Sequence, residues 1–191
     1  MASITGTENH LPKLSRFITT HDADAKAVFH KGLSEDMPVS VVDGYGYTFC
    51  LAYATNKFPV RIQEEEDVHT YSEYLANPPR LGQHVWNVDF EPHVACAMHR
   101  TVSLDYGVVL EGEIELILDS EETRVLKRGD TAVQRGTSHA WKNVTPDREV
   151  NGEKVGSWAR ILFVLSPSEP LEVGGNALGE STPGINVRQS S

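Results

Sequence analysis

The stretch HRTVSLDYGVVLEGEIELILDSEETRVL, residues 99–126, decides the fold of this chain. Its apolar runs YGVVL, IELIL and TRVL are four or five residues long and are separated by short acidic or glycine-containing turns. Short apolar runs between frequent turn residues are typical of antiparallel strands, and the runs on either side of residues 119–122 predict a hairpin with an acidic tip. The same spacing continues from residue 83 to residue 166. We therefore predict an all-β protein built on an antiparallel sandwich or barrel.

Two segments that precede this core have other patterns. Residues 16–30 contain two short apolar runs around the turn HDADAK, which predicts a hairpin because aspartate favours turns. In residues 61–75, Val68, Tyr71 and Leu75 are three and four positions apart behind an acidic start. This spacing predicts a short amphipathic helix or an excursion over the surface.

The two ends of the chain are polar and rich in Gly, Ser, Asn and Pro. Such compositions are typical of arms that carry no chemistry of their own. A length of 191 residues with 39% hydrophobic content suits one sizeable core. We therefore divide the chain into an N-terminal arm (1–15), one β-barrel domain (16–171, with its core motifs in 83–166) and a C-terminal tail (172–191).

Composition also excludes several partners. The formal net charge is −10 and no block is rich in Lys or Arg, which argues against a nucleic-acid partner. No apolar run approaches the roughly 20 residues of a membrane helix. Cys50 and Cys96 are the only cysteines and form no C-x-x-C pair, which fits a reducing compartment. We expect a cytoplasmic protein that binds a small molecule.

Polar side chains gather where the strands of the core begin and end. His99 and Thr101 share a strand face because they are two residues apart, and Asp105 opens the next strand. If the turn between these strands is tight, Asp105 lies across the ladder from His99 and Thr101, with facing Cβ atoms roughly 5 Å apart. We expect these three side chains to meet.

A second polar cluster lies in GDTAVQRGTSHAWKN, residues 129–143. His139, Trp141 and Asn143 share one strand face, and Trp141 is the best candidate for stacking on a flat substrate. Arg135, in the turn before His139, is either exposed or reaches over the barrel mouth to hold a carboxylate with two hydrogen bonds.

The two stretches together resemble the two sequence motifs of the cupin superfamily, and their wording is similar to a subgroup of small monocupins common in fungi and bacteria. The resemblance implies a jelly-roll β-barrel, also called a double-stranded β-helix, that often dimerises with an N-terminal strand exchanged. The specific match to the two motifs covers about fifty residues. The matching positions of the first motif are His99, Asp105 and Gly112, and those of the second are Gly129, Gly136, His139 and Asn143.

This chain departs from the family pattern at the metal site. Thr101 stands where the family has its second histidine, Asp105 replaces a glutamate, and the second motif lacks its proline and one further residue. The family ligands are carried over only at His99, Asp105 and His139. Two imidazoles and one carboxylate suit Fe(II), and Zn or Mn also bind such a set. A metal-free pocket, in which a histidine exchanges a proton with substrate while Asp105 orients it, is the alternative.

The superfamily includes isomerases, decarboxylases, dioxygenases and binding proteins, so the fold alone does not select an activity. Our first hypothesis is a lyase- or isomerase-like enzyme that acts by proton transfer on a small acidic or phenolic metabolite, such as a natural-product intermediate. His99, Asp105 and His139 would be catalytic, and Thr101, Arg135 and Trp141 would bind substrate. The alternatives are an Fe(II) dioxygenase that uses the same three residues as ligands, and a binding protein without chemistry. His84 has no such context, and we interpret it as structural.

Overall fold

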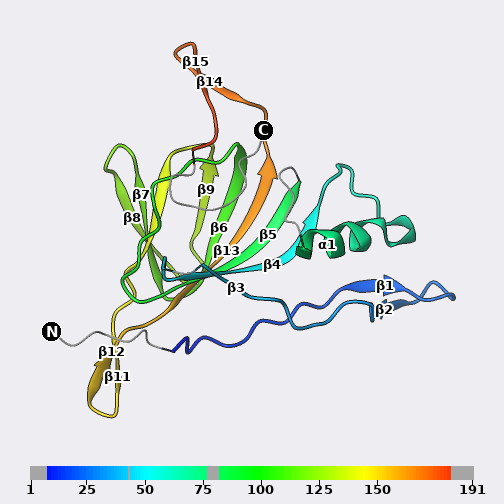
Figure 1. Ribbon diagram of the computed structural model, residues 1–191, viewed down its shortest axis with the longest axis horizontal. Coiled ribbons are helices and arrows are strands. Elements are labelled where there is room, and N and C mark those ends of the chain that lie inside the picture. The colour runs from blue at the N-terminus through cyan, green and yellow to red at the C-terminus, as the bar shows by residue number, and fades with distance from the viewer. Residues whose placement is uncertain (1–7, 43, 77–81, 182–191) are drawn as a thin grey trace.

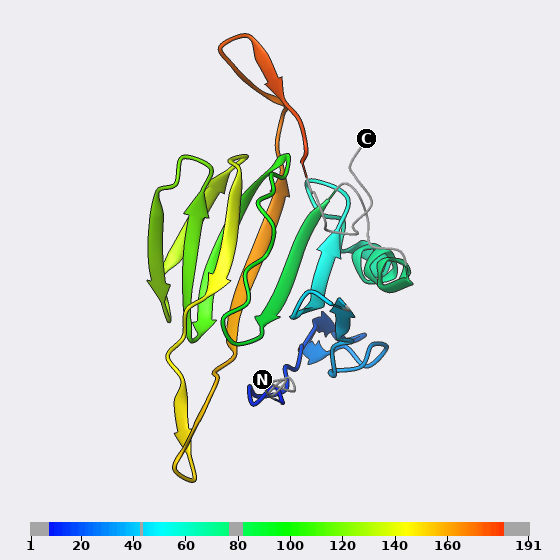
Figure 2. The same cartoon turned by 60° about the vertical axis from the view of Figure 1, so that its left-hand side comes forward.

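The apolar runs form strands that assemble into two facing antiparallel sheets (Figures 1 and 2). The computed structural model describes residues 8–42, 44–76 and 82–181. The strands of the larger sheet, in spatial order, are β3 (Ser40–Val42), β4 (Tyr47–Thr55), β5 (Gln83–Phe90), β13 (Ala159–Pro167), β6 (Ser103–Glu111) and β9 (Thr131–Arg135). Those of the smaller sheet are β10 (His139–Asn143), β7 (Glu113–Leu118) and β8 (Thr123–Lys127). The all-β prediction is confirmed, with β7 and β8 as the predicted hairpin.

The protein core lies between the two sheets. Alternation along each strand turns one set of side chains inward, and Val88, Val109, Ile114 and Ile161 are almost completely buried there together with Trp141. Burial of this apolar face stabilises the fold by about 1.5–3 kcal/mol for each large side chain. Besides packing, a side-chain hydrogen bond joins the two sheets, because the Asn143 amide of β10 donates to the Phe90 carbonyl of β5 at 3.1 Å.

Gly112 lets the chain cross from the larger sheet to the smaller one between β6 and β7. Its φ of +79° is in the left-handed region, and a Cβ on it would lie 2.4 Å from the Thr145 hydroxyl oxygen and 3.0 Å from the Cβ of Ala159. A side chain at this corner would therefore clash as well as strain the backbone.

Three hairpins project from the two-sheet body (Figure 1). They are β1 (Thr19–His21) with β2 (Ala27–Phe29), β11 (Arg148–Val150) with β12 (Glu153–Val155), and β14 (Leu171–Val173) with β15 (Asn176–Leu178). The first was predicted, and Asp22 makes its turn by accepting hydrogen bonds from the backbone of Asp24 and Lys26, both at 2.9 Å.

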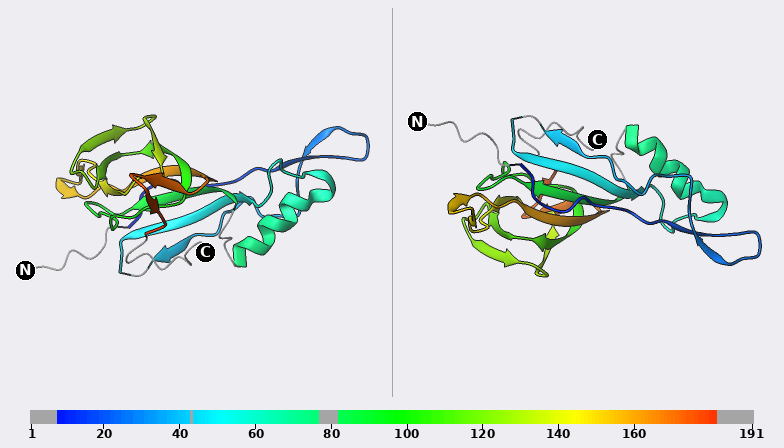
Figure 3. Two further views of the ribbon diagram at one scale, coloured as in Figure 1. Left: turned by 90° about the horizontal axis from the view of Figure 1, so that it is seen from above. Right: turned by 90° about the horizontal axis from the view of Figure 1, so that it is seen from below.

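The described ranges contain one α-helix, α1 (Glu66–Ala76), which follows a 3₁₀ turn, η1 (Gln63–Glu65), and lies beside the end of β4 (Figure 3). Tyr71 is fully buried against Leu51 and Ala54, and its hydroxyl donates to the Leu51 carbonyl at 2.8 Å. The predicted apolar stripe is shifted at its end, because Leu75 is exposed and Tyr74 packs in its place. No helix in the described ranges is long and apolar enough to cross a membrane.

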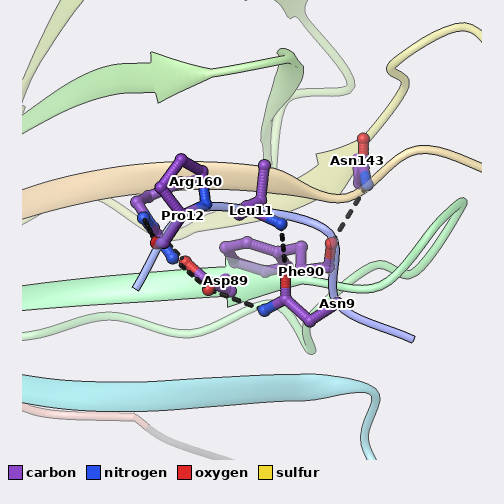
Figure 4. Close-up of polar contacts among 7 residues, drawn as sticks. All are labelled: Asn9, Leu11, Pro12, Asp89, Phe90, Asn143 and Arg160. Atoms are coloured by element: carbon purple, nitrogen blue, oxygen red, sulfur yellow. Dashed lines mark hydrogen bonds and ion pairs between the residues drawn. The ribbon is translucent and has the colours of Figure 1, made fainter. Parts of the chain in front are cut away.

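An ion pair on the outer face of the larger sheet ties the N-terminal arm to the barrel (Figure 4). Arg160 of β13 faces Asp89 of β5, with Nε–Oδ1 and Nη2–Oδ2 distances of 2.5 and 2.6 Å. The same pair holds the arm, because Arg160 donates to the Pro12 carbonyl and the Asn9 amide donates to Asp89, both at 2.8 Å. The arm is therefore ordered from Asn9 to Pro12.

Candidate active site

The two motif histidines lie side by side, but not in the way the sequence predicts. His99 is opposite His139, and the two residues exchange both backbone hydrogen bonds at 2.9 Å. Their ring centroids are 4.4 Å apart. The expected ladder between His99 and Asp105 is wrong, because the segment after His99 leaves β10 and crosses to the larger sheet instead of making a tight turn.

Backbone carbonyls fix which ring nitrogen of each histidine carries the proton. Nδ1 of His99 lies 2.9 Å from the Ala97 carbonyl, and Nδ1 of His139 lies 2.9 Å from that of Thr137. A carbonyl oxygen only accepts hydrogen bonds, so both Nδ1 atoms are donors in the neutral rings. Each Nε2 then has a free lone pair, which can take a proton or hold a metal.

Asp105 lies across from these histidines on the larger sheet. In β6 it is opposite Leu165 of β13 and Gln134 of β9. The Thr101 hydroxyl donates to Oδ2 at 2.8 Å, so the predicted contact between these two residues forms by the crossover. The carboxyl is only 4% exposed, and Oδ1 has no hydrogen-bond partner among the described residues.

Burial of Asp105 raises the pKa of its carboxyl above the usual range. The hydroxyls of Ser103 and Thr101 and the charge of His99 oppose this shift. Ser103 lies near the carboxyl without hydrogen-bond geometry, since its own hydroxyl also lacks a partner in the described part of the chain. Asp105 is therefore a buried acid that holds its proton to higher pH than an exposed aspartate.

Two further polar residues belong to this end of the barrel. Because Gln134 pairs with Asp105, and His84 pairs with Leu165, a row of facing residues crosses the inner side of the larger sheet. Gln134 is 3% exposed and accepts a hydrogen bond from the Thr137 hydroxyl at 2.6 Å. The alternation in TAVQR was a usable signal for Gln134, because it turns Gln134 inward together with Ala132.

His84 was interpreted from the sequence as structural. Its side chain is largely buried, its Nε2 has no partner among the described residues, and burial lowers the pKa of its imidazole. Only the sheet register, which places His84 two strands from Asp105, shows that it lies in the same row.

The two other substrate-binding candidates have different positions. Trp141 is 2% exposed and forms the floor of the site, with its ring 5.5 Å from that of His139 and 5.4 Å from that of Phe163. Arg135 is exposed on the outward face of β9, since alternation turns Gln134 inward. The structure therefore does not place Arg135 beside His99, Asp105 and His139.

The metal set is less complete than the resemblance implies. Across residues 8–42, 44–76 and 82–181, no group of three or more His, Cys, Asp or Glu side chains lies close enough together to hold a metal ion. His99, Asp105 and His139 thus share one end of the barrel without forming a three-ligand cluster. A metal at these residues stays a prediction, and no step below depends on it.

The two facing antiparallel sheets, with His99 and His139 paired beside the smaller sheet and Asp105 on the larger one, have the arrangement of a jelly-roll β-sandwich or barrel. No family model matches the sequence. Phomopsin biosynthesis cluster protein D of Diaporthe leptostromiformis is 44% identical over 181 residues, which cover 93% of this chain and 90% of the relative. A cupin-domain-containing oxidoreductase of Aspergillus ruber is 35% identical over 191 residues, which cover 91% of this chain and 84% of the relative.

Among solved structures, an RmlC-like cupin from Shewanella frigidimarina aligns with a TM-score of 0.45 and 14% identity, over 73% of this chain and 91% of that one. On the strength of the curated relatives, this chain belongs to the cupin superfamily, as its two motifs indicated.

Proposed function

We propose that this protein is an enzyme of natural-product biosynthesis that moves a proton on a small acidic or phenolic metabolite. The reaction would be a decarboxylation, a dehydration or an isomerisation. The relationship to a phomopsin biosynthesis cluster protein supports the metabolic setting. One observation carries the chemistry: the buried carboxyl of Asp105, with one oxygen that lacks a partner among the described residues, lies at the same end of the fold as two imidazoles whose Nδ1 atoms donate and whose Nε2 atoms therefore present lone pairs.

The histidines supply the base. Burial, reinforced by the nearby charge of His99, lowers the pKa of His139 to about 4, against the opposing effect of its hydrogen bond to Thr137. His139 is therefore neutral at pH 7, and its Nε2 can accept a proton from a carbon next to a carbonyl group or from a hydroxyl. We assign the acid to Asp105, because burial favours the protonated form of its carboxyl and raises its pKa.

In an isomerisation, these two groups balance the reaction without another reactant. His139 removes a proton from the carbon next to a carbonyl, the electron pair moves toward the carbonyl oxygen, and Asp105 donates its proton there to give an enol. His139 then returns its proton to a different carbon of the conjugated enol, while the enol hydroxyl returns its proton to Asp105, so the shift is complete and both groups are restored. The buried ring of Trp141 packs against His139 and gives this proposed base an apolar neighbour.

Thr101→Val should shift the pH profile of the activity. The Thr101 hydroxyl stabilises the ionised carboxylate of Asp105, so its removal raises the pKa of Asp105 further. Since the proposed acid must be protonated, we expect the alkaline limb of kcat/KM to move to higher pH. Thr131→Val, on the exposed side of β9, is the control and should leave the limb in place. An unchanged limb in Thr101→Val, or one moved to lower pH, contradicts the role of Asp105.

The direct test uses isotope exchange. Purified protein is incubated in D₂O with a panel of aryl acetic acids, β-keto acids and phenolic acids, and mass spectrometry follows deuterium uptake or loss of CO₂ or water. We expect turnover that falls by about a hundredfold or more in Asp105→Asn, because general acid–base catalysis contributes that much. Arg135→Gln should be unaffected. Turnover that survives Asp105→Asn in a folded variant would refute the proposal.

The name of the Aspergillus ruber relative, a cupin-domain-containing oxidoreductase, favours a second candidate, an Fe(II) dioxygenase. His99 and His139 present free Nε2 atoms that suit such a metal, but the donor groups do not form a three-ligand cluster in the described residues. Stoichiometric iron that disappears in His99→Ala, together with uptake of dioxygen, would replace proton transfer by this candidate. Ligand binding without any turnover would favour a binding protein.

A further inference from the structure

An open cavity of about 170 Å³ lies at the mouth of the barrel on the smaller sheet. Leu116 and Leu118 of β7 form its apolar side, and Glu122, Thr123 and Arg124 form its polar side. None of these residues was singled out by the motifs.

The sheet register places this cavity next to His139 and Trp141. Leu118 is directly opposite His139, and Leu116 is directly opposite Trp141 on one side and Arg124 on the other. Residues that face one another in a ladder point to the same side of the sheet, and neighbouring strands are about 4.8 Å apart. Arg124 is therefore two strand spacings, roughly 10 Å, from β10, the strand that holds His139 and Trp141.

Arg124 belongs to the inner face of the smaller sheet. It is two residues from Leu126, which is 7% exposed and packs in the core, so both lie on the same side of β8. Its position on an edge strand at the open end leaves it exposed. Its guanidinium is therefore accessible to a ligand that enters the cavity.

The guanidinium of Arg124 has no carboxylate partner in the described residues. Its Nη1 donates to the carbonyl of the neighbouring Thr123 at 2.7 Å, and the Glu122 carboxylate accepts instead from Ser120 at 3.3 Å. The other cations of this hairpin are paired, Lys127 with Glu113 and Arg128 with Glu111. Arg124 thus differs from the other two cations in that it lines the cavity without a carboxylate partner in the described residues.

We infer that Arg124 binds a carboxylate of the substrate, while Leu116 and Leu118 contact its apolar body. The substrate class is then an organic acid with an apolar or aromatic part that reaches from Arg124 toward His139. This inference rests on the proposed function and assigns to Arg124 the task that the sequence suggested for Arg135. Planar guanidinium groups suit this task because they hold a carboxylate with two parallel hydrogen bonds.

The test compares a carboxylate probe with its neutral counterpart. Calorimetric titration measures the binding of benzoate and of benzamide to the wild type, Arg124→Gln and Arg135→Gln. We expect the wild type to prefer benzoate by about tenfold, since hydrogen bonds to charged groups contribute at least about 1.5 kcal/mol. Arg124→Gln should lose this preference, whereas the matched control Arg135→Gln should keep it. Glu122→Gln should increase the affinity for benzoate, because it removes a like charge from the cavity wall.

Three outcomes would overturn the assignment: an unchanged benzoate affinity in Arg124→Gln, an equal loss in Arg135→Gln, or no preference for benzoate in the wild type. Asp105→Asn separates this inference from the proposed function. That variant should lose turnover and still bind benzoate through Arg124. If it keeps turnover while Arg124→Gln loses benzoate binding, proton transfer by Asp105 fails and the carboxylate site stands.

Discussion

Replacement of Asp89 by alanine is expected to lower the free energy of unfolding by about 3–5 kcal/mol. Asp89 and Arg160 are 7% and 6% exposed, and the guanidinium makes two parallel bonds to the carboxylate. Without Asp89, a buried positive charge keeps only the Pro12 carbonyl as a partner among the described residues. The desolvation of that charge then has no compensation, so the loss exceeds the value of an ordinary hydrogen bond.

Urea unfolding followed by tryptophan fluorescence measures this loss of stability, and two further variants serve as controls. Asp36→Ala breaks the exposed pair between Lys13 and Asp36, with a distance of 2.8 Å, and should cost less than about 1 kcal/mol. The double variant Asp89→Leu with Arg160→Met removes both charges and should recover much of the stability, because no ion is then left unpaired. A cost in Asp89→Ala as small as that in Asp36→Ala would show that the pair does not hold the arm to the barrel.

This ion pair also shows where prediction from the sequence ends. The strands from β5 to β13 were predictable, because their apolar runs alternate with polar residues at a spacing that suits few other structures. That Asp89 and Arg160 face each other, 71 residues apart, depends on the strand order, which local patterns do not contain. The N-terminal arm was accordingly recognised by its composition, but its anchor was not.

The site shows the same limit at closer range. His99, Asp105 and His139 were found by motif, and the contact between Thr101 and Asp105 was expected. The pairing of His99 with His139 was not, because it requires the chain to run beside β10 before it crosses between sheets. Alternation along β9 could have separated the outward Arg135 from the inward Gln134. The position of Arg124 near His139 and Trp141 depends instead on the register of β7 with β10 and β8, which local patterns do not contain.

The stability of the protein should fall in acid because of His139. Burial lowers the pKa of its imidazole from 6.5 to about 4 in the folded protein, while the unfolded chain has the ordinary value. Between these two pH values the unfolded state binds more protons than the folded state, so the free energy of unfolding rises with pH. The stabilisation is complete above about pH 6.5 and is lost as the pH falls toward 4, by about 3 kcal/mol in total. Asp105 acts in the opposite direction, since its raised pKa favours the folded state at low pH.

A comparison of variants separates the two contributions. His139→Leu cannot titrate at this position, so the difference between its free energy of unfolding and that of the wild type should change by about 3 kcal/mol between pH 7 and pH 4. Val133→Leu is the control, because Val133 is an exposed residue of β9 without a titratable group and should give a constant difference. Parallel profiles for the wild type and His139→Leu would mean that the imidazole of His139 is not held neutral by burial. The comparison therefore also tests the protonation state of the proposed base, because only the neutral imidazole accepts a proton.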